Sequence, residues 1–207
     1  MWMHNKVIAS GVKIIANSVI ILALALLAYV SFLKYHANGW LNFLGLLIVN
    51  SIFVVMYIAK RDATSISQSP ALWLLAFVGT CMPLVLRPTA TVSAWAGTGN
   101  VLQLVGLSAI ATAILSLRRS FGIVPAHRGI RTEGIYNLVR HPLYASELLW
   151  MLGFVIANPS AWNIAIWLCD CALQFTRACA EERFLSFDPV YAHYRARVRY
   201  RLLPLVL

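Results

Sequence analysis

Six apolar runs divide this chain and restrict its possible folds more than any other feature of the sequence. They cover residues 14–32, 40–58, 71–86, 100–117, 142–157 and 161–180. A helix of about 20 apolar residues crosses the hydrocarbon layer of a bilayer. Only helices and closed barrels satisfy their own backbone hydrogen bonds in lipid. The runs therefore predict an all-α integral membrane protein with five or six transmembrane helices.

The composition agrees with a membrane protein, because 60% of the residues are hydrophobic and only 12% are charged. A soluble domain is about half apolar and a quarter charged. Large soluble modules are therefore excluded, and the net charge of +10 is not expected to mark a nucleic-acid-binding domain. The cysteines lie inside apolar runs, and the histidines show no paired spacing on a membrane helix. We expect neither a disulfide framework nor a metal site.

The last two apolar runs are expected to form a tight helical hairpin. They are separated only by Asn158, Pro159 and Ser160. Asn-Pro favours a turn, and Ser160 is a suitable N-cap for the helix that follows. The run 142–157 would rise only about 24 Å as a helix, which is short for a complete crossing.

The basic residues predict the orientation of the chain. In a six-segment arrangement, every Lys and Arg except Lys34 and Arg87 falls on one side. Cytoplasmic loops carry the excess of Lys and Arg, so both termini are expected in the cytoplasm. The membrane would be a bacterial inner membrane or one like the endoplasmic reticulum.

Acidic residues divide the chain into two parts. Asp62 is the only acidic residue before Arg118, whereas six follow it. We therefore interpret residues 1–117 as an N-terminal transmembrane scaffold of four helices and residues 118–207 as a C-terminal catalytic region, within a single structural domain.

A polar stripe runs along the sixth apolar segment. Its members, Asp170, Gln174, Arg177 and Glu181, lie within about 60° of one another on a helix. Ionisable groups in a membrane helix normally pair or line a hydrated cavity, so the stripe is a candidate functional site. The alternative is a ladder of pairs that only stabilises the bundle. Glu182 points about 100° away from Glu181, which predicts different partners for the two carboxylates.

A second candidate site precedes the fifth helix. Pro142 suits the first turn of a helix, so Arg140 and His141 would lie at its positive end, beside unpaired N–H groups suited to an anion. Tyr144 and Glu147 would share a face inside the hairpin. The alternatives are an interface anchor for Arg140 and a capping or core role for His141.

The residues around these sites resemble a known family. Residues 134–144 read GIYNLVRHPLY, EERFL follows from Glu181, and Tyr191, Tyr194 and Pro204 come later. This combination resembles the isoprenylcysteine carboxyl methyltransferase family and related membrane phospholipid methyltransferases. The similarity covers residues 121–204, and Ser146 departs from it where relatives usually have glycine.

The resemblance implies an S-adenosylmethionine-dependent methyltransferase with a cytoplasmic cofactor pocket built from the RHPxY loop, the last hairpin and the C-terminal segment. By position, the cofactor-binding residues would be Gly134, Tyr136, Leu138, Arg140, His141, Tyr144, Glu181 and Glu182. Arg177 resembles the arginine proposed in the family to steer the acceptor. Arg177 and Glu181 are therefore the candidate catalytic residues.

The methyl acceptor is expected to be lipophilic, because the chain is so apolar. It would be a carboxylate, as in an isoprenylcysteine, or a lipid headgroup. A carboxylate or thiolate needs only orientation, whereas an ammonium must first lose a proton, which would recruit His141 or Glu181. The sequence leaves the acceptor and the oligomeric state open.

Two other functions remain as alternatives. One is a membrane NADPH-dependent reductase of the sterol type, for which Arg128, Arg131, Arg195 and Arg197 offer extra phosphate contacts. The other is a non-catalytic carrier or helper protein. An ion pathway would need polar groups across the depth of several helices, but here they gather toward the cytoplasmic side.

Overall fold

The computed structural model describes residues 41–91 and 93–204, together with residues 18, 21, 22, 24–26, 28–30, 32 and 33. Two compact units divide the chain after Ile58. The predicted first helix, 14–32, falls largely outside the described residues. In the first unit the long described helix is α2, Leu41–Ala59.

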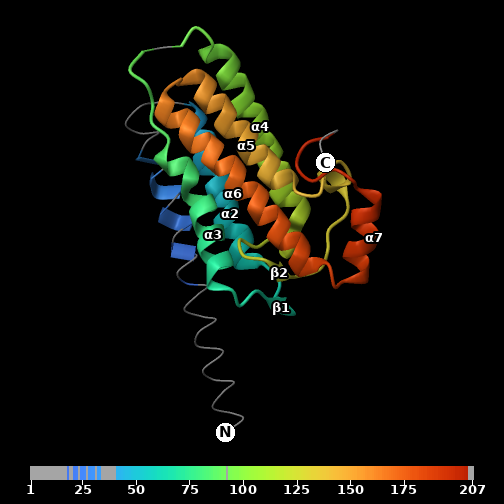
Figure 1. Ribbon diagram of the computed structural model, residues 1–207. Helices are drawn as coiled ribbons and strands as arrows, with labels where there is room; N and C mark the ends of the chain where they lie inside the picture. The colour runs from blue at the N-terminus through green and yellow to red at the C-terminus, as the bar shows by residue number, and fades with distance from the viewer. Residues whose placement is uncertain are drawn as a thin grey trace. The chain divides into compact units, whose positions relative to one another are not determined.

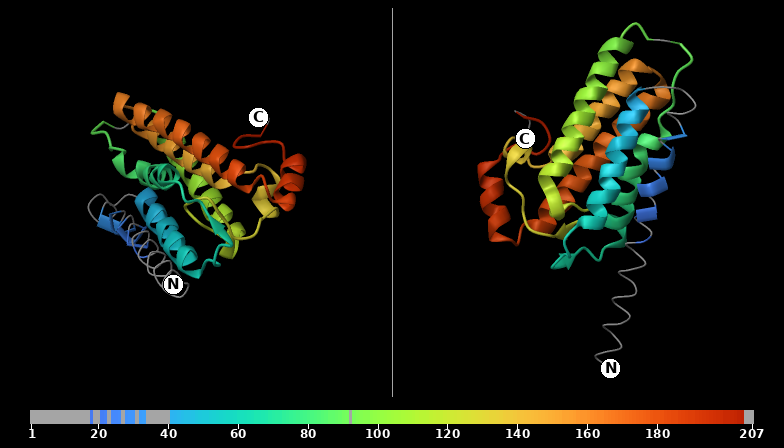
Figure 2. Two further views of the ribbon diagram at one scale, coloured as in Figure 1. Left: turned by 60° about the horizontal axis from the view of Figure 1, so that its bottom comes forward. Right: turned by 180° about the vertical axis from the view of Figure 1, so that it is seen from behind.

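The second unit, Ala59–Leu207, holds the helices that carry the candidate sites. Its long helices lie side by side in Figures 1 and 2. The α-helices are α3 (Pro70–Cys81), α4 (Ala96–Leu117), α5 (Pro142–Ala157), α6 (Ala161–Leu185) and α7 (Pro189–Arg197). Three short 3-10 helices are η1 (Met82–Val85), η2 (Arg118–Ser120) and η3 (Gly134–Asn137). Strands β1 (Ser65–Ile66) and β2 (Ala126–His127) pair antiparallel, with Ser65 opposite His127.

The helix boundaries differ from the apolar runs at several places. Helix α5 coincides with the run 142–157, whereas α4 begins at Ala96 instead of residue 100. Helix α6 continues to Leu185, past the end of the apolar run at residue 180, because charged residues can extend a helix beyond the apolar part of its sequence. Helix α7 was not predicted. The six-segment count stays a prediction: among the described residues, Ala96–Ser120 is the helical segment that is long and apolar enough to cross a membrane.

Helices α4 and α5 approach each other closely through glycines. A Cβ atom added to Gly106 would lie 2.7 Å from the Trp150 Cα atom, and one added to Gly153 would lie 2.7 Å from the Gln103 backbone nitrogen. Small residues allow such close backbone contact between membrane helices. Ser146, which replaces the glycine usual in relatives, is buried and donates to the Pro142 carbonyl at 2.7 Å. This hydrogen bond satisfies its hydroxyl inside the helix.

The turn between α5 and α6 lies at the same end of the unit as Arg87. Ser160 caps α6 by accepting from the Asn163 N–H at 3.1 Å, which confirms its predicted capping role. The Asn163 amide donates to the Arg87 carbonyl at 2.8 Å, and the Asn158 side chain accepts from the Thr89 N–H at 3.2 Å. Helix α5 runs from the other end, where η3 and α7 are found. The RHPxY loop and Arg87 are thus at opposite ends of the helices.

Candidate active site

Arg140 is buried at the start of α5, with His141 as the N-cap residue. Its guanidinium donates from Nε to Glu182 Oε1 at 2.8 Å. From Nη1 it donates to the carbonyls of Val198 at 2.8 Å and Arg199 at 2.6 Å. Arg140 therefore joins α5 to α6 and to the segment after α7. These contacts do not support the alternative of a simple interface anchor.

The C-terminal segment pairs with the backbone just before the first turn of α5. The backbone N–H groups of Arg140 and His141 donate to the carbonyls of Tyr200 and Arg201, each at 2.9 Å. Buried backbone donors require partners, and this extended segment supplies them from within the chain.

Glu182 is the internal member of the acidic pair, since its side chain is only 4% exposed. Besides Arg140, it accepts from Arg201 Nε at 3.1 Å and Nη2 at 3.0 Å, and His141 Nε2 lies 3.3 Å from it. Burial by itself raises the pKa of the Glu182 carboxyl. The hydrogen bonds from His141, Arg201 and Arg140 outweigh burial and hold that pKa well below its usual range.

Glu181 has different surroundings: it shares His141 with Glu182, but its other partner differs, as predicted for the two acids. Its side chain is 33% exposed. The Tyr144 hydroxyl donates to Glu181 Oε2 at 3.0 Å, and His141 Nδ1 lies 3.7 Å from the same oxygen. The His141 ring stacks on the Tyr144 ring, with their centres 5.5 Å apart. Glu181 is thus oriented by two side chains and still open to a ligand.

The polar stripe of α6 continues from Glu181 into the bundle, where Asp170, Gln174 and Arg177 are buried. Gln174 Nε2 donates to Glu147 Oε2 of α5 at 2.8 Å, and its Oε1 accepts from Arg177 Nη1 at 3.0 Å. The Arg177 guanidinium lies 4.7 Å from the centre of the Tyr144 ring. Tyr144 and Glu147 therefore both face α6, which confirms their predicted shared face.

The three loop residues carried over from the family have different positions. Gly134 has a φ of +63°, a left-handed conformation that favours glycine. Tyr136 is buried in a cluster with Tyr191, Tyr194 and Val198. Burial, and then the charge of Glu181, raise the pKa of Tyr136 well above its usual value, so its phenol is neutral and near the site. The side chain of Leu138, by contrast, is 63% exposed.

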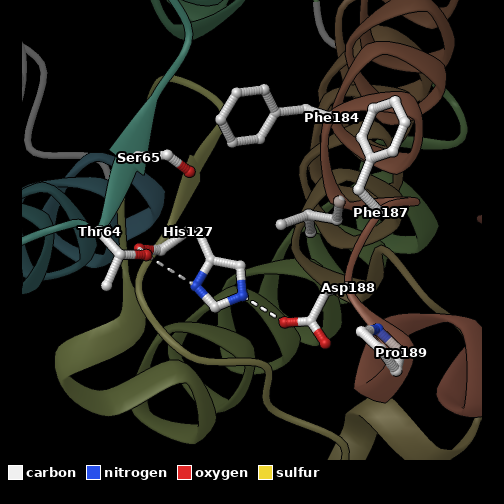
Figure 3. Close-up of a pocket in the computed structure, with 8 residues that line it drawn as sticks. Thr64, Ser65, His127, Phe184, Phe187, Asp188 and Pro189 are labelled. Atoms are coloured by element: carbon white, nitrogen blue, oxygen red, sulfur yellow. Dashed lines mark hydrogen bonds and ion pairs between the residues drawn. The ribbon is translucent and has the colours of Figure 1, made fainter.

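A pocket of about 570 Å³ lies outside this cluster, at the junction of β1, β2 and the α6–α7 corner (Figure 3). It is lined by Thr64, Ser65, His127, Phe184, Leu185, Phe187, Asp188 and Pro189. His127 pairs through Nε2 with Asp188, and its Nδ1 lies 3.1 Å from the Thr64 hydroxyl. The contact with His127, followed by the Val190 N–H, lowers the pKa of Asp188. We did not predict this pocket, because its residues come from three separate segments.

The fold and the site together define a bundle of apolar helices with an ion cluster at one end of its last two long helices. Residues 90–191 match the model of a family described as phospholipid methyltransferase. This segment is just under half of the chain, and it resembles the isoprenylcysteine carboxyl methyltransferases and phospholipid methyltransferases. The match contains Arg140, His141, Tyr144, Arg177, Glu181 and Glu182.

Two curated relatives from Arabidopsis thaliana are similar to this chain. Protein-S-isoprenylcysteine O-methyltransferase B is 31% identical over 99 residues, which cover 42% of this chain and 48% of the relative. Protein-S-isoprenylcysteine O-methyltransferase A is 30% identical over 112 residues, which cover 48% of this chain and 55% of the relative. The chain thus spans about half the length of the curated relatives it matches.

Proposed function

We propose that this protein is an integral membrane methyltransferase that uses S-adenosylmethionine to methylate a lipophilic acceptor at the cytoplasmic face. The similarity of residues 90–191 to phospholipid methyltransferases supports methyl transfer. The observation that carries the proposal is the open carboxylate of Glu181, which Tyr144 and His141 orient. The buried guanidinium of Arg177 lies one turn before Glu181 on α6.

The chemistry of these side chains fits S-adenosylmethionine. The cofactor carries a sulfonium, an ammonium, ribose hydroxyls and a carboxylate. Glu181 would hold a cationic or hydroxyl part, with Tyr144 and His141 beside it. When bound, the cofactor supplies an electrophilic methyl group, and transfer breaks its carbon–sulfur bond as the bond to the acceptor forms.

Arg140 and Glu182 would act behind this group of side chains. Their charges are already satisfied by each other, by Arg201 and by backbone carbonyls. We infer that they fix the relative positions of α5, α6 and the C-terminal segment, and that Glu181 makes the ligand contact. Positioning of donor and acceptor with exclusion of water accounts for much of the rate of such displacements.

The apolar surface of α6 supports a lipophilic acceptor. Large side chains such as Leu168 and Phe175 are exposed on this helix. An exposed apolar face beside a polar site suits an acceptor that arrives from the lipid. A carboxylate or thiolate acceptor would need only orientation by Arg177, and an ammonium acceptor would give its proton to Glu181 or His141.

Calorimetric binding to the detergent-purified full chain tests this proposal. We expect S-adenosylmethionine and S-adenosylhomocysteine to bind, NADPH not to bind, and Glu181→Ala to weaken both adenosyl ligands about tenfold or more, because a charge-assisted contact is lost. Glu133→Ala, at an exposed loop position, is the matched control. Binding of NADPH alone would favour the reductase, and binding of no compound would favour the carrier.

Methyl transfer is then measured with labelled cofactor and two acceptors. An S-isoprenylcysteine tests a carboxylate acceptor, and vesicles containing an aminophospholipid test an amine. Label in neither acceptor, despite cofactor binding, would contradict the proposed acceptor classes.

A further inference from the structure

Arg177 is a buried base without a direct ion pair, although Asp170 and Glu147 are near enough for their charges to interact with it. Its side chain is 7% exposed, and within the described part of the chain no carboxylate forms an ion pair with it within 4.0 Å. The groups that it contacts directly are neutral: the Gln174 amide at 3.0 Å, the Ile123 carbonyl at 3.4 Å and the face of the Tyr144 ring. Buried charges are normally paired, and the lack of a carboxylate in direct contact with Arg177 leaves a place for an anionic group of a ligand.

Gln174 stands between Arg177 and a carboxylate that is near it. The amide of Gln174 accepts from the guanidinium with its oxygen and donates to Glu147 with its nitrogen at 2.8 Å. A glutamine can satisfy both groups at once without adding a charge. A glutamate at the same position would neutralise Arg177 directly. Gln174 therefore links the acid and the base while keeping them apart.

Gly79 of α3 leaves the space that the Arg177 side chain fills. A Cβ atom at this position would lie 3.0 Å from Arg177 Nη1 and 3.1 Å from its Cδ atom. Such a contact is tighter than ordinary packing and would displace the guanidinium slightly. Gly79 lies outside the segment 90–191 that matches the family, so a scaffold helix contributes to the position of this arginine.

We propose that Gln174 and Gly79 are positioning residues that hold the Arg177 guanidinium clear of Glu147, so that it binds an anionic oxygen group of a ligand. This inference rests on the proposed methyltransferase function. The anion comes either from the acceptor, as a carboxylate or phosphate, or from the carboxylate of the cofactor. The effect of Gln174→Glu distinguishes the two sources.

The first experiment compares wild type with Gln174→Glu in detergent. It measures the Kd of S-adenosylhomocysteine and the KM and kcat for methylation of an S-isoprenylcysteine. If the acceptor supplies the anion, its KM rises about tenfold or more while the Kd stays within about twofold. If the cofactor supplies the anion, the Kd rises by that factor. In both cases kcat at saturation changes less than the binding constant.

The double variant Gln174→Glu with Glu147→Gln separates this role from a structural one. The exchange restores the number of charges and the amide–carboxylate hydrogen bond. It leaves a carboxylate beside Arg177, so the binding constant is expected to stay as weak as in Gln174→Glu. Recovery to the wild-type value in the exchanged protein would overturn the inference.

Gly79→Ala tests the space around Arg177 with little risk to folding, because alanine favours a helix more than glycine does. In Gly79→Ala we expect a threefold increase, roughly, in the same binding constant that Gln174→Glu raises, either the Kd or the KM. This effect is smaller than that of an added charge. Gly97→Ala is the matched control, since nothing lies within 4 Å of a Cβ atom there.

Three further results would count against the inference. Unchanged binding constants in a folded Gln174→Glu protein would do so while leaving the proposed function intact. Equal changes of the binding constant in Gly79→Ala and Gly97→Ala would contradict the proposed role of Gly79 in positioning Arg177. A wild-type protein that binds neither S-adenosylhomocysteine nor the anionic amphiphile would overturn both this inference and the proposed function.

Discussion

Adjacent residues of similar chemistry have different surroundings in this protein. Glu181 and Glu182 belong to the same motif, yet one is oriented and open while the other is enclosed by Arg140, His141 and Arg201. One step along a helix turns a side chain by about 100°, so neighbouring acids contact different elements. The two glutamates should therefore respond differently to the same substitution.

We predict that Glu182→Gln destabilises the fold and that Glu181→Gln does not. Removing the Glu182 charge leaves Arg140 buried without its acid, which costs about 3 kcal/mol or more. Thermal unfolding in detergent measures the effect, with Glu181→Gln as the matched control. Equal melting temperatures for the two variants would contradict the internal role of Glu182.

Stability should also depend on pH through carboxyl groups with lowered pKa values. Glu182 and Asp188 both have pKa values below the usual range of about 4. Each carboxylate stabilises the fold fully at pH values above its pKa in the unfolded chain. This stabilisation is lost as the pH falls toward and through its pKa in the folded protein. The contribution of these two groups to the melting temperature should be level from pH 7 to about 5 and fall below that. Glu182→Gln and Asp188→Asn should each flatten the fall, and an unchanged acid profile in both would contradict this assignment.

The RHPxY and EERFL segments were sufficient to predict which residues lie together at the site. They did not predict which contacts each side chain makes. Arg140, His141, Tyr144, Glu181 and Glu182 were predicted together and lie together. The enclosure of Glu182 depends on Arg201, which carries no motif signal. The pairing of His127 with Asp188 joins residues far apart in the sequence, so spacing gave no indication of it.

At the scale of elements, the α4–α5 contact determines where the start of α5 lies. It depends on Gly106 and Gly153, whose missing side chains allow close backbone approach. Gly106→Val should therefore destabilise the protein by about 1–3 kcal/mol, the usual cost of overpacking. Thermal unfolding measures this, and Gly97→Ala on the same helix is the control. A tolerated valine would show that the two helices can separate without loss.

The accuracy of the predicted elements follows from local chemistry. Helix α5 was predicted at its observed bounds because Pro142 marks its start and Asn158-Pro159 marks its end. Helix α6 continues past the apolar run because hydropathy reports only the apolar part of a helix, and Glu181, Glu182 and Arg183 are helical but charged. Helix α7 was missed because its buried side chains are Tyr191 and Tyr194, which do not form an apolar run.

At the scale of the second unit, charge is distributed between two ends. Arg87 lies beside the α5–α6 turn, where Asn158 and Asn163 bind the backbone of residues 87 and 89. The ion cluster of Arg140, His141 and Glu182 lies at the opposite end of the helices. The paired strands β1 and β2 lie at that end too (Figure 1). This arrangement agrees with the charge asymmetry that predicts a cytoplasmic RHPxY loop.

Cysteine labelling in membranes tests this orientation. Single cysteines are introduced at Ala94, Ala161 and Phe187, all exposed positions, after the four native cysteines are changed to alanine. An impermeant maleimide should reach Ala94→Cys and Ala161→Cys from the outer face and Phe187→Cys only from the cytoplasmic face. The side chain of Phe187 is 92% exposed, so a failure to label there would reflect its side of the membrane. Labelling of Ala161→Cys from the same face as Phe187→Cys would show that α5 and α6 do not each cross the bilayer. The acceptor would then have to approach the Arg177 site from the cytoplasmic leaflet alone.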